Sequence, residues 1–469
     1  MKRLSNKEAI NYLGQEITLT GWVNDRKDLG QIVFIYLRDR SGLIQVVLAP
    51  QELDEESKQL IKNIRPEFVL EIKGIVNQRP QKQINKDLET GAVEILAKKV
   101  KILNESKTPP FEIKNEEKQA NEELRLKYRY LDLRHERMKK NIILRHKIKK
   151  CIWDFLDQED FLEIETPILT KGTPEGAREF IVPSRVYPGQ FYVLPQAPQQ
   201  FKQLLMVAGF EKYFQFAKCF RDEDSRGDRQ PEFTQLDMEM SFISQQDILT
   251  LIEKMITEMI EKIMPEKKIS FKPFPRIAYQ EAMEKYHSDK PDLRKDRNDP
   301  NELAFCFITD FPLFEYSETE KKLVSVHHPF TSPQKQDLGL LETAPLKVKA
   351  EQYDFICNGF EVGGGSIRIH KRELQEKIFR ILNIEEKEIK RRFGHILEAF
   401  EYGAPPHGGI ALGFDRLIMI LANEPNIREV IPFAKTTDAK DLMMGAPSEL
   451  PQEQLEQVHI KIINNKKSN

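Results

Sequence analysis

Residues 220–242 constrain this chain more than any other stretch, because a strongly charged segment is followed there by alternating polar and apolar positions. Segment 221–233 contains three arginines and five carboxylates, and the alternation over 234–242 predicts a strand that returns after a polar loop. A charged loop is usually only solvated, but arginine also binds phosphate and carboxylate oxygens through paired hydrogen bonds. The return strand carries polar side chains on a face that a structural strand would make apolar: Gln235, Asp237 and Glu239. We interpret the stretch as the floor of a site for a charged small molecule.

Composition limits the class of protein. The 469 residues are enough for two or three domains, and 40% hydrophobic with 31% charged residues allows a sizeable core. A net charge of −2 neither indicates nor excludes a polyanionic partner. The four cysteines form no C-x-x-C pair, which argues against a disulfide framework or a zinc site. The chain has neither a signal-peptide core nor an 18-residue apolar run, so we expect a cytoplasmic protein that does not engage a membrane.

The first 105 residues predict a small barrel. One helical stretch, 51–63, lies between the third and fourth of five expected strands. This order fits an OB-type Greek-key barrel, which binds single-stranded nucleic acid on its sheet. A barrel that serves only as a dimer spacer is the alternative. The expected strands are 16–24, 32–38, 43–48, 68–77 and 93–103.

The remainder predicts a hinge and an α+β domain. Segment 106–134 is polar and carries a Pro-Pro pair, so we expect a hinge there and a catalytic domain over 135–469. Helical spacing predicts a helix over 136–158, and Ser244 with Asp247 predicts a capping box that starts a helix ending at Pro265. Strands come in runs with helices between the runs, which favours an antiparallel sheet over a doubly wound one. The other expected elements are strands at 161–167, 191–194, 213–220, 306–310, 323–327 and 366–370, and a helical stretch at 374–400.

Two arginines far apart in sequence predict a nucleotide site. Arg221 opens the charged loop and Arg416 ends the segment Gly-Phe-Asp-Arg at 413–416. Together they could clamp a triphosphate, which favours nucleotidyl transfer because such a reaction needs mainly positioning and charge stabilisation. Asp354 and Glu361 could be Mg²⁺ ligands, or simply two solvated acids. No P-loop and no Rossmann fingerprint occurs in the chain.

Three further segments surround this expected site. Glycines 363–365 would let a ligand approach the backbone, and Arg368 could then pair with a substrate carboxylate. Segments 173–178 and 327–333 look like loops able to close over the site. Because adjacent residues of an extended segment point to opposite faces, we expect only one of His327 and His328 to contact substrate, and no two-histidine metal site.

These motifs resemble those of a known family. Segments 161–167, 220–242 and 408–421 resemble the three signatures of class II aminoacyl-tRNA synthetases. Four further segments resemble, more specifically, the bacterial-type aspartyl-tRNA synthetases: 173–178, 199–202, 327–333 and 363–368. The resemblance covers nearly the whole chain. It implies an OB-fold barrel followed by a class II catalytic domain, ATP-dependent charging of tRNA-Asp with L-aspartate, a need for Mg²⁺, and a homodimer whose interface includes the first signature.

The resemblance also implies a role for particular residues. The residues implied to be catalytic are Arg221, Glu361 and Arg416. The aspartate contacts would be Glu175, Gln199, Lys202, Arg221, Asp237, His327 and Arg368. The ATP contacts would be Arg221, Asp222, Glu223, Gln230, Phe233, Glu361, Gly413, Phe414, Asp415 and Arg416. The Mg²⁺ ligands would be Asp354 and Glu361, and the anticodon contacts Arg26, Phe34 and Gln45.

Specificity for aspartate is expected from the cationic pair Lys202 and Arg368, since asparagine would leave one buried cation unpaired, at a cost of about a few kcal/mol. The chain departs from the family pattern after segment 288–294, which normally leads into a large inserted domain. Here only the short segment 295–305 follows, and any role of that domain on the tRNA acceptor side is in doubt.

Four rival functions remain. A relaxed enzyme would also charge tRNA-Asn; Leu29 resembles the discriminating subtype, but one position discriminates weakly. An asparaginyl-tRNA synthetase is disfavoured by the pair Lys202 and Arg368. A catalytically dead RNA-binding paralogue should lack Arg221, Glu361 or Arg416, and all three are present. A tRNA-free aspartate–ammonia ligase should lack the barrel.

Overall fold

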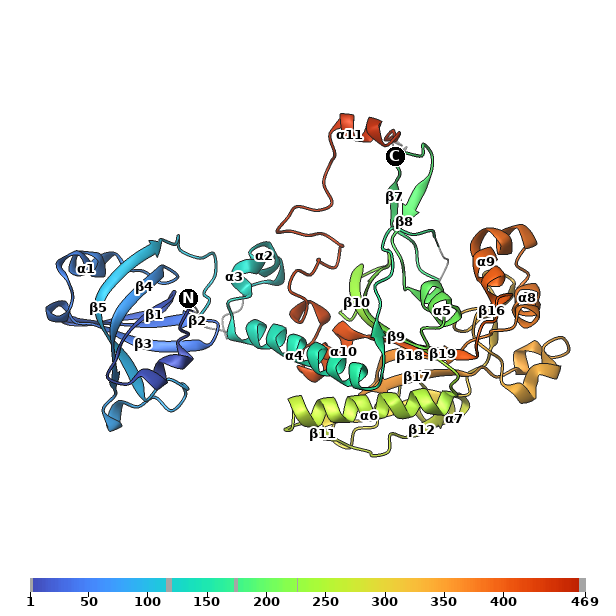
Figure 1. The fold of residues 1–469 in the computed structure, drawn as a ribbon, viewed down its shortest axis with the longest axis horizontal. Coiled ribbons are helices and arrows are strands. Elements are labelled where there is room, and N and C mark those ends of the chain that lie inside the picture. Colours follow the sequence, from blue (N-terminus) through green and yellow to red (C-terminus); the bar gives the residue numbers. More distant parts are fainter. Residues whose placement is uncertain (1–2, 115–119, 173–175, 226, 464–469) are drawn as a thin grey trace. The chain divides into compact units, whose positions relative to one another are not determined.

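The computed structural model describes residues 3–114, 120–172, 176–225 and 227–463. The chain divides into two compact units (Figure 1). Unit 1 comprises Met1–Arg125 with Tyr130–His135, and unit 2 comprises Leu126–Arg129 with Glu136–Asn469. No helix among the described residues is both long and apolar enough to cross a membrane.

Unit 1 contains a closed five-stranded barrel with strand order β1-β2-β3-β5-β4. Alternate residues of β2, such as Val33, Ile35 and Leu37, point into its core. The short helix α1 (Glu55–Leu60) lies between β3 and β4, and its N-cap Asp54 accepts the backbone N–H of Ser57. The expected five strands and intervening helix are therefore confirmed. The strands are β1 (Glu16–Leu29), β2 (Ile32–Asp39), β3 (Gly42–Leu48), β4 (Val69–Gln78) and β5 (Val93–Asn104).

Unit 2 is built on an eight-stranded sheet with the order β12-β14-β17-β18-β19-β10-β9-β6. All pairs from β14 to β9 are antiparallel, and the two edge strands pair in parallel. This confirms the antiparallel α+β expectation. The strands are β6 (Leu162–Glu163), β9 (Lys212–Phe220), β10 (Glu232–Ser241), β12 (Arg276–Ala278), β14 (Phe305–Thr309), β17 (Gln352–Cys357), β18 (Phe360–Ile367) and β19 (His407–Gly413).

The two faces of this sheet differ in chemistry. Helices α4 (Glu136–Gln158) and α6 (Gln245–Ile263) pack against one face, as Figure 1 shows, and share an apolar core with Leu236 and Met238 of β10. The predicted capping box of α6 is present at Ser244. Because side chains alternate along a strand, the intervening polar residues of β10 face the other side. Helix α5 (Gln199–Val207) lies on that side.

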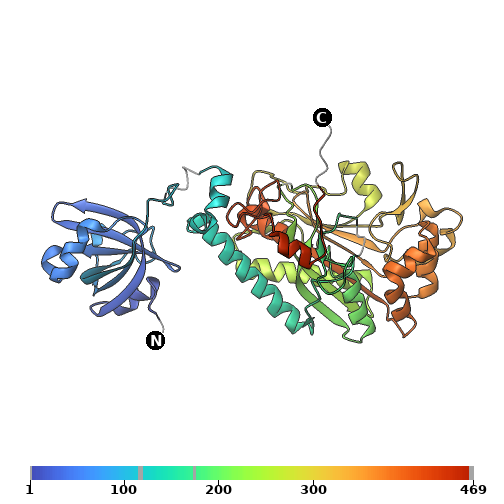
Figure 2. The same ribbon diagram turned by 90° about the horizontal axis from the view of Figure 1, so that it is seen from above.

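Three sequence-based boundaries were wrong. The expected helix over 374–400 is two helices, α8 (Arg372–Ile381) and α9 (Glu386–Phe400), because Asn383 adopts φ +53° and ends the first. They lie side by side at one end of unit 2 (Figures 1 and 2). The expected strand over 161–167 is only the two-residue β6. The expected strand over 366–370 instead ends at Ile367, since glycines 363–365 belong to β18 and not to a loop.

The glycines of β18 permit close contact with β19. A Cβ on Gly365 would lie 2.1 Å from the carbonyl oxygen of Gly409, which no side chain tolerates. The remaining elements are α2 (Glu122–Lys127), α3 (Arg129–Asp132), α7 (Tyr279–Tyr286), α10 (Phe414–Leu421), α11 (Gln452–Gln457), β7 (Ile181–Pro183), β8 (Phe191–Val193), β11 (Lys268–Ile269), β13 (Glu302–Leu303), β15 (Phe314–Ser317) and β16 (Lys322–Ser325).

Segment 295–305 forms a closed turn. The Glu302 carboxylate accepts the backbone N–H groups of Lys295 at 3.0 Å and Asp296 at 2.9 Å, and the hydroxyl of Ser270 at 2.8 Å. These bonds satisfy the backbone where the chain passes directly from the sequence 288–294 into β13.

Candidate active site

A cavity of about 510 Å³ opens on the polar face of the sheet in unit 2. Its wall is formed by α5, β10, β18, the start of α10 and the loops that contain Arg221 and His327. The sequence-predicted residues that line it are Gln199, Lys202, Arg221, Glu223, Gln230, Phe233, Asp237, His327, Glu361, Arg368, Gly413, Asp415 and Arg416.

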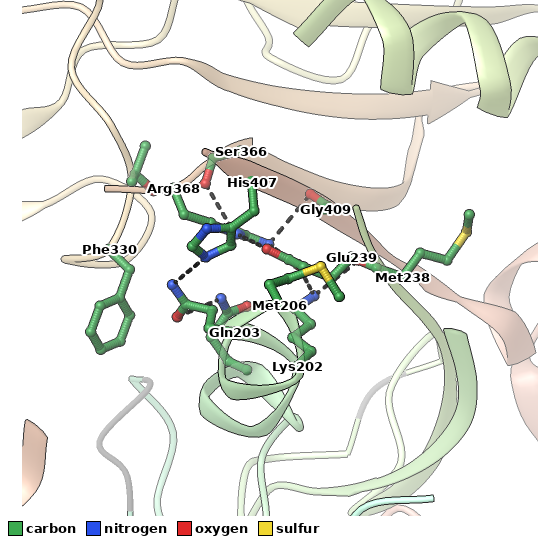
Figure 3. Close-up of polar contacts among 12 residues, drawn as sticks. Lys202, Gln203, Met206, Met238, Glu239, Phe330, Ser366, Arg368, His407 and Gly409 are labelled. Atoms are coloured by element: carbon green, nitrogen blue, oxygen red, sulfur yellow. Dashed lines mark hydrogen bonds and ion pairs between the residues drawn. The ribbon is translucent and has the colours of Figure 1, made fainter. Parts of the chain in front are cut away.

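Two cations from distant parts of the chain meet at one buried carboxylate. Lys202 Nζ lies 2.7 Å from Asp237 Oδ1 and 3.2 Å from Glu239 Oε2. Arg368 donates to the same Glu239 through Nε at 2.9 Å and Nη2 at 3.1 Å. Figure 3 shows the side chain of Lys202 pointing from α5 toward this group. All four side chains are at most 2% exposed.

Electrostatics keep the Glu239 carboxylate ionised. Burial opposes the ionisation of Glu239, but Arg368 and Lys202 outweigh it and lower its pKa to about 2. Burial raises the pKa of Asp237, and Lys202 opposes this rise. The Oδ2 atom of Asp237 has no partner within the described residues. A buried acceptor oxygen at the cavity wall suits a ligand ammonium group.

This pairing corrects our specificity argument. From the sequence, we expected Lys202 and Arg368 to lack a partner until a substrate carboxylate binds, whereas in the structure both already contact Glu239. Asparagine would therefore not leave an unpaired buried cation. The sequence placed Glu239 on the polar face of the strand, but we gave it no role. Its pairing with the two cations could not be read from the sequence, because Lys202 and Arg368 lie 37 and 129 residues away along the chain.

Both histidines of the loop line the cavity. Their ring centroids lie 4.4 Å apart, so the expectation that they point to opposite faces was wrong: this loop is not an extended strand. His328 Nε2 lies 2.7 Å from Arg368 Nη1. Burial, together with His327 and Arg368, lowers the pKa of His328 well below its ordinary value, so the ring is neutral and can accept from the guanidinium.

The other end of the cavity carries the predicted nucleotide residues. The Arg221 guanidinium lies over the Phe233 ring at 5.1 Å, and the Nε of Arg221 has no partner within the described residues. Arg416 donates to Asp228 Oδ2 at 3.0 Å and to the carbonyl of Glu361. Both arginines line the cavity, which suits a polyphosphate.

Gln230 and Glu223 are held by their neighbours. The Gln230 amide donates to the carbonyl of Lys435 at 3.0 Å and accepts its N–H at 2.8 Å. Glu223 pairs with Arg229 at 2.9 Å. Both line the cavity and keep further lone pairs or hydrogens for a ligand.

Asp354 and Glu361 are two acidic residues whose charges interact, an arrangement that suits a divalent cation; Glu361 lines the cavity and Asp354 does not. Burial and the adjacent Glu361 raise the pKa of Asp354. Burial opposes ionisation of Glu361, but Lys290 at 2.9 Å and Arg416 outweigh it and lower its pKa. The described residues contain no group of three or more side chains fit to hold a metal. A cation here would thus take two carboxylates and complete its coordination with phosphate and water oxygens, as Mg²⁺ commonly does.

Some predicted contacts do not reach the cavity. Phe414 is 1% exposed and packs on Phe216 with ring centroids 5.1 Å apart, so it is a core residue. Asp222 is exposed and does not line the cavity. Asp415 reaches the wall but accepts the backbone N–H of Thr234 at 2.8 Å, which ties α10 to β10. Glu175 lies outside the described residues.

The barrel carries a separate candidate surface. Phe34 and Gln45 lie on the same outer face, because Phe34 pairs with Val47, two residues from Gln45, in the register of β2 and β3. Tyr36, opposite Gln45, shares this face and was missed. Arg26 instead donates to the carbonyls of Ile61 and Ile64 at 2.9 and 2.7 Å, so its guanidinium serves the barrel itself.

Other wall residues were also missed by sequence analysis. Lys290 contacts Glu361 of the acidic pair, and Asp228 contacts Arg416. Gln200 lines the cavity, is 5% exposed, and has no partner for either amide atom within the described residues. Gln200 belongs to segment 199–202, which resembles the family, but the sequence analysis gave it no role.

Two protein-family models match the sequence of this chain. Residues 121–437 match the model for class II tRNA synthetases (D, K and N), and residues 17–103 match the model for the OB-fold nucleic acid binding domain. The solved asparaginyl-tRNA synthetase of Pyrococcus horikoshii in complex with asparaginyl-adenylate superposes with a TM-score of 0.74 at 22% identity, covering 93% of this chain and 98% of that one. The aspartyl-tRNA synthetase of Entamoeba histolytica gives 0.71 at 22%, covering 92% and 91%. The fold and site thus define a class II aminoacyl-tRNA synthetase.

Relatives that are similar in sequence identify the family within this class. The aspartate–tRNA(Asp/Asn) ligase of Dehalococcoides mccartyi strain 195 is 42% identical over 583 positions, covering 96% of this chain and 97% of the relative. The aspartate–tRNA ligase of Geobacillus kaustophilus is 42% identical over 576 positions, covering 96% and 97%. The chain belongs to the bacterial aspartyl-tRNA synthetase family. Since the first alignment spans 583 positions and this chain has 469 residues, at least 114 aligned positions have no counterpart here.

Proposed function

We propose that this enzyme activates L-aspartate with ATP and transfers it to the 3′ end of tRNA-Asp. The observation that carries the proposal is the cavity in which Lys202 and Arg368 meet at Glu239 and which Arg221 and Arg416 also line. A diacid and a nucleotide triphosphate can bind side by side in such a cavity. The names of the relatives, aspartate–tRNA ligases, support this choice of amino acid.

The reaction needs charge neutralisation and alignment from the protein. The α-carboxylate of aspartate attacks the α-phosphorus of ATP, the bond to the bridging oxygen breaks, and pyrophosphate leaves. Arg221 is proposed to bind the α-phosphate, and Arg416 the γ-phosphate, so both compensate negative charge that moves onto the departing oxygens. The terminal ribose 3′-hydroxyl then attacks the aspartyl carbonyl, and AMP leaves. The adenine is proposed to stack on Phe233.

The amino acid would be held at both ends. Lys202 and Arg368, fixed in place by Glu239, are proposed to bind the side-chain carboxylate, with a hydrogen bond from the His327–His328 loop closing over it. Asp237 and Gln199, and Glu175 outside the described residues, would bind the ammonium group. The Oδ2 atom of Asp237, for which no described residue is a hydrogen-bond partner, supports this assignment.

Asp354 and Glu361 are proposed to hold Mg²⁺. When bound, the ion would neutralise charge on the phosphates. Lys290 contacts Glu361 at 2.9 Å and stabilises the ionised form that a metal ligand requires.

The barrel is proposed to bind the anticodon through Phe34 and Gln45, and residues 106–134 to act as a hinge. We place the missing family insertion at 295–305, where the chain makes the closed turn around Glu302. All four cysteines are buried, and none forms a disulfide in the part of the chain that the structure describes, which supports a cytoplasmic location.

The chain is proposed to form a homodimer through the region of the first signature, residues 161–167. Large apolar side chains are exposed there and on the neighbouring β7–β8 hairpin, which supports a protein partner; they include Leu162, Ile168, Leu169, Ile181 and Phe191. Sedimentation equilibrium of the wild type and of Leu169→Lys tests this, and a monomeric wild type would refute it.

The amino-acid assignment is tested with Arg368→Ala. We expect aspartate-dependent pyrophosphate exchange to be abolished while ATP binding, measured by calorimetry, is largely retained. Arg372→Ala is the matched control, because Arg372 is a half-exposed arginine on α8 that pairs with Glu376 and does not line the cavity. Normal exchange by Arg368→Ala would refute the assignment.

Charging of tRNA-Asn as well is the second candidate function. It is favoured by relatives named for both tRNAs. Aminoacylation of purified tRNA-Asp and tRNA-Asn with labelled aspartate distinguishes the two candidate functions, because an enzyme specific for tRNA-Asp does not charge tRNA-Asn.

A further inference from the structure

We propose that Gln203 and His407 are positioning residues that fix the orientation of the Gln199 amide, so that its oxygen faces the ammonium group of bound aspartate. The inference rests on the proposed function. Neither Gln203 nor His407 lines the cavity, and both are fully buried behind its wall. They can therefore act on the substrate only through another side chain.

The three residues form a continuous chain of hydrogen bonds. Gln199 Nε2 donates to Gln203 Oε1 at 3.2 Å, and Gln203 Nε2 lies 3.2 Å from His407 Nε2. His407 Nδ1 lies 2.8 Å from the carbonyl oxygen of Pro405. Figure 3 shows the Gln203 amide pointing from α5 at the imidazole of His407.

The direction of every bond follows from the Pro405 carbonyl. A carbonyl only accepts, so His407 Nδ1 must carry the hydrogen. Burial lowers the pKa of His407, and a neutral ring with hydrogen on Nδ1 presents a lone pair at Nε2. Gln203 must then donate with its nitrogen and turn its oxygen toward Gln199, which in turn must donate with its own nitrogen.

The consequence is a defined polarity at the cavity wall. With its nitrogen committed to Gln203, Gln199 presents Oε1 to the cavity, and none of the described residues donates a hydrogen bond to that oxygen. An oxygen attracts an ammonium group, whereas the reversed amide would repel it. The relay therefore matters only for ligands that carry an ammonium group.

This selectivity gives the test. Succinate is aspartate without its amino group, and we expect it to compete with aspartate in the pyrophosphate-exchange assay. Gln203→Met removes both polar atoms at nearly constant volume. We expect it to raise the KM for aspartate by about tenfold or more, the effect of one hydrogen bond to a charged group, while the Ki of succinate and the KM of ATP change less than about twofold.

Gln203→Glu is the conservative variant. Its carboxylate still accepts from Gln199 and can accept from a protonated His407, so it should recover most of the aspartate affinity that Gln203→Met loses. His407→Phe, which removes the acceptor at Nε2 together with the Nδ1–H that donates to Pro405, should show the same selective loss as Gln203→Met. Equal weakening of aspartate and succinate, or an unchanged aspartate KM, would overturn the relay. Wild-type enzyme without aspartate-dependent exchange would instead refute the proposed function itself.

Discussion

Replacing Glu239 with glutamine should destabilise unit 2 by about 3 kcal/mol at pH 7. Lys202 and Arg368 lower the pKa of this fully buried carboxyl from 4.5 to about 2, and each tenfold change in proton affinity is worth about 1.4 kcal/mol. The magnitude agrees with the cost of about 3–5 kcal/mol for removing one partner of a buried ion pair. Because the pKa of the folded state lies below the ordinary value, the contribution is fully present above pH 4.5 and is lost as the pH falls toward 2.

The two tryptophans make this measurable. Trp22 lies in unit 1 and Trp153 in unit 2, and the chain has no others. In a Trp22→Phe background, the fluorescence of Trp153 during urea unfolding reports unit 2 alone. Glu239→Gln and the parent are compared at pH 7, with Glu258→Gln as the control, a substitution on α6 outside the cavity. A difference below about 1 kcal/mol would refute the claim that Glu239 holds the two cations in place.

Three other substitutions have clear expected outcomes. Phe34→Ala should weaken tRNA binding by about 1–3 kcal/mol, the value of one base–aromatic stack, without changing pyrophosphate exchange, which needs no tRNA; a filter-binding assay checks this, and unaltered binding contradicts the anticodon role. Gly365→Ala should greatly reduce soluble expression or lower the Tm, because its Cβ would lie 2.1 Å from the Gly409 carbonyl; a wild-type Tm contradicts the close strand approach. Gln200→Leu should raise the stability of unit 2 by about 1–2 kcal/mol, since it removes a buried amide that has no partner among the described residues; a lower Tm would show that the amide is bonded.

Local patterns were sufficient for most elements. The limits of α4, Glu136–Gln158, coincide with the predicted helix, and the capping box of α6 was read from Ser244 and Asp247. The barrel strands were found because alternation with period two marks a surface buried on one side. The two helices at 372–400 were merged because the left-handed turn at Asn383 leaves no periodic signal.

Contacts between distant residues were beyond sequence reasoning. Arg26 was expected to meet tRNA, which stays a prediction; in the structure it contacts the carbonyls of Ile61 and Ile64 and the carboxylate of Asp28. Phe414 lies between two expected nucleotide contacts, yet the first turn of α10 directs it into the core against Phe216. Which side chains of the first helical turn face the core depends on the sheet against which the helix packs.

The sequence alone determined the two-part organisation, the antiparallel sheet, the family resemblance and most of the cavity wall, because these follow from periodicity and from motifs of contiguous residues. Tertiary structure decided how the charges are paired: Glu239 between Lys202 and Arg368, Lys290 at Glu361, and the orientation of Gln199. Ion pairs and hydrogen bonds act over about 3 Å, so their partners are fixed only when strands and helices from remote parts of the chain come together.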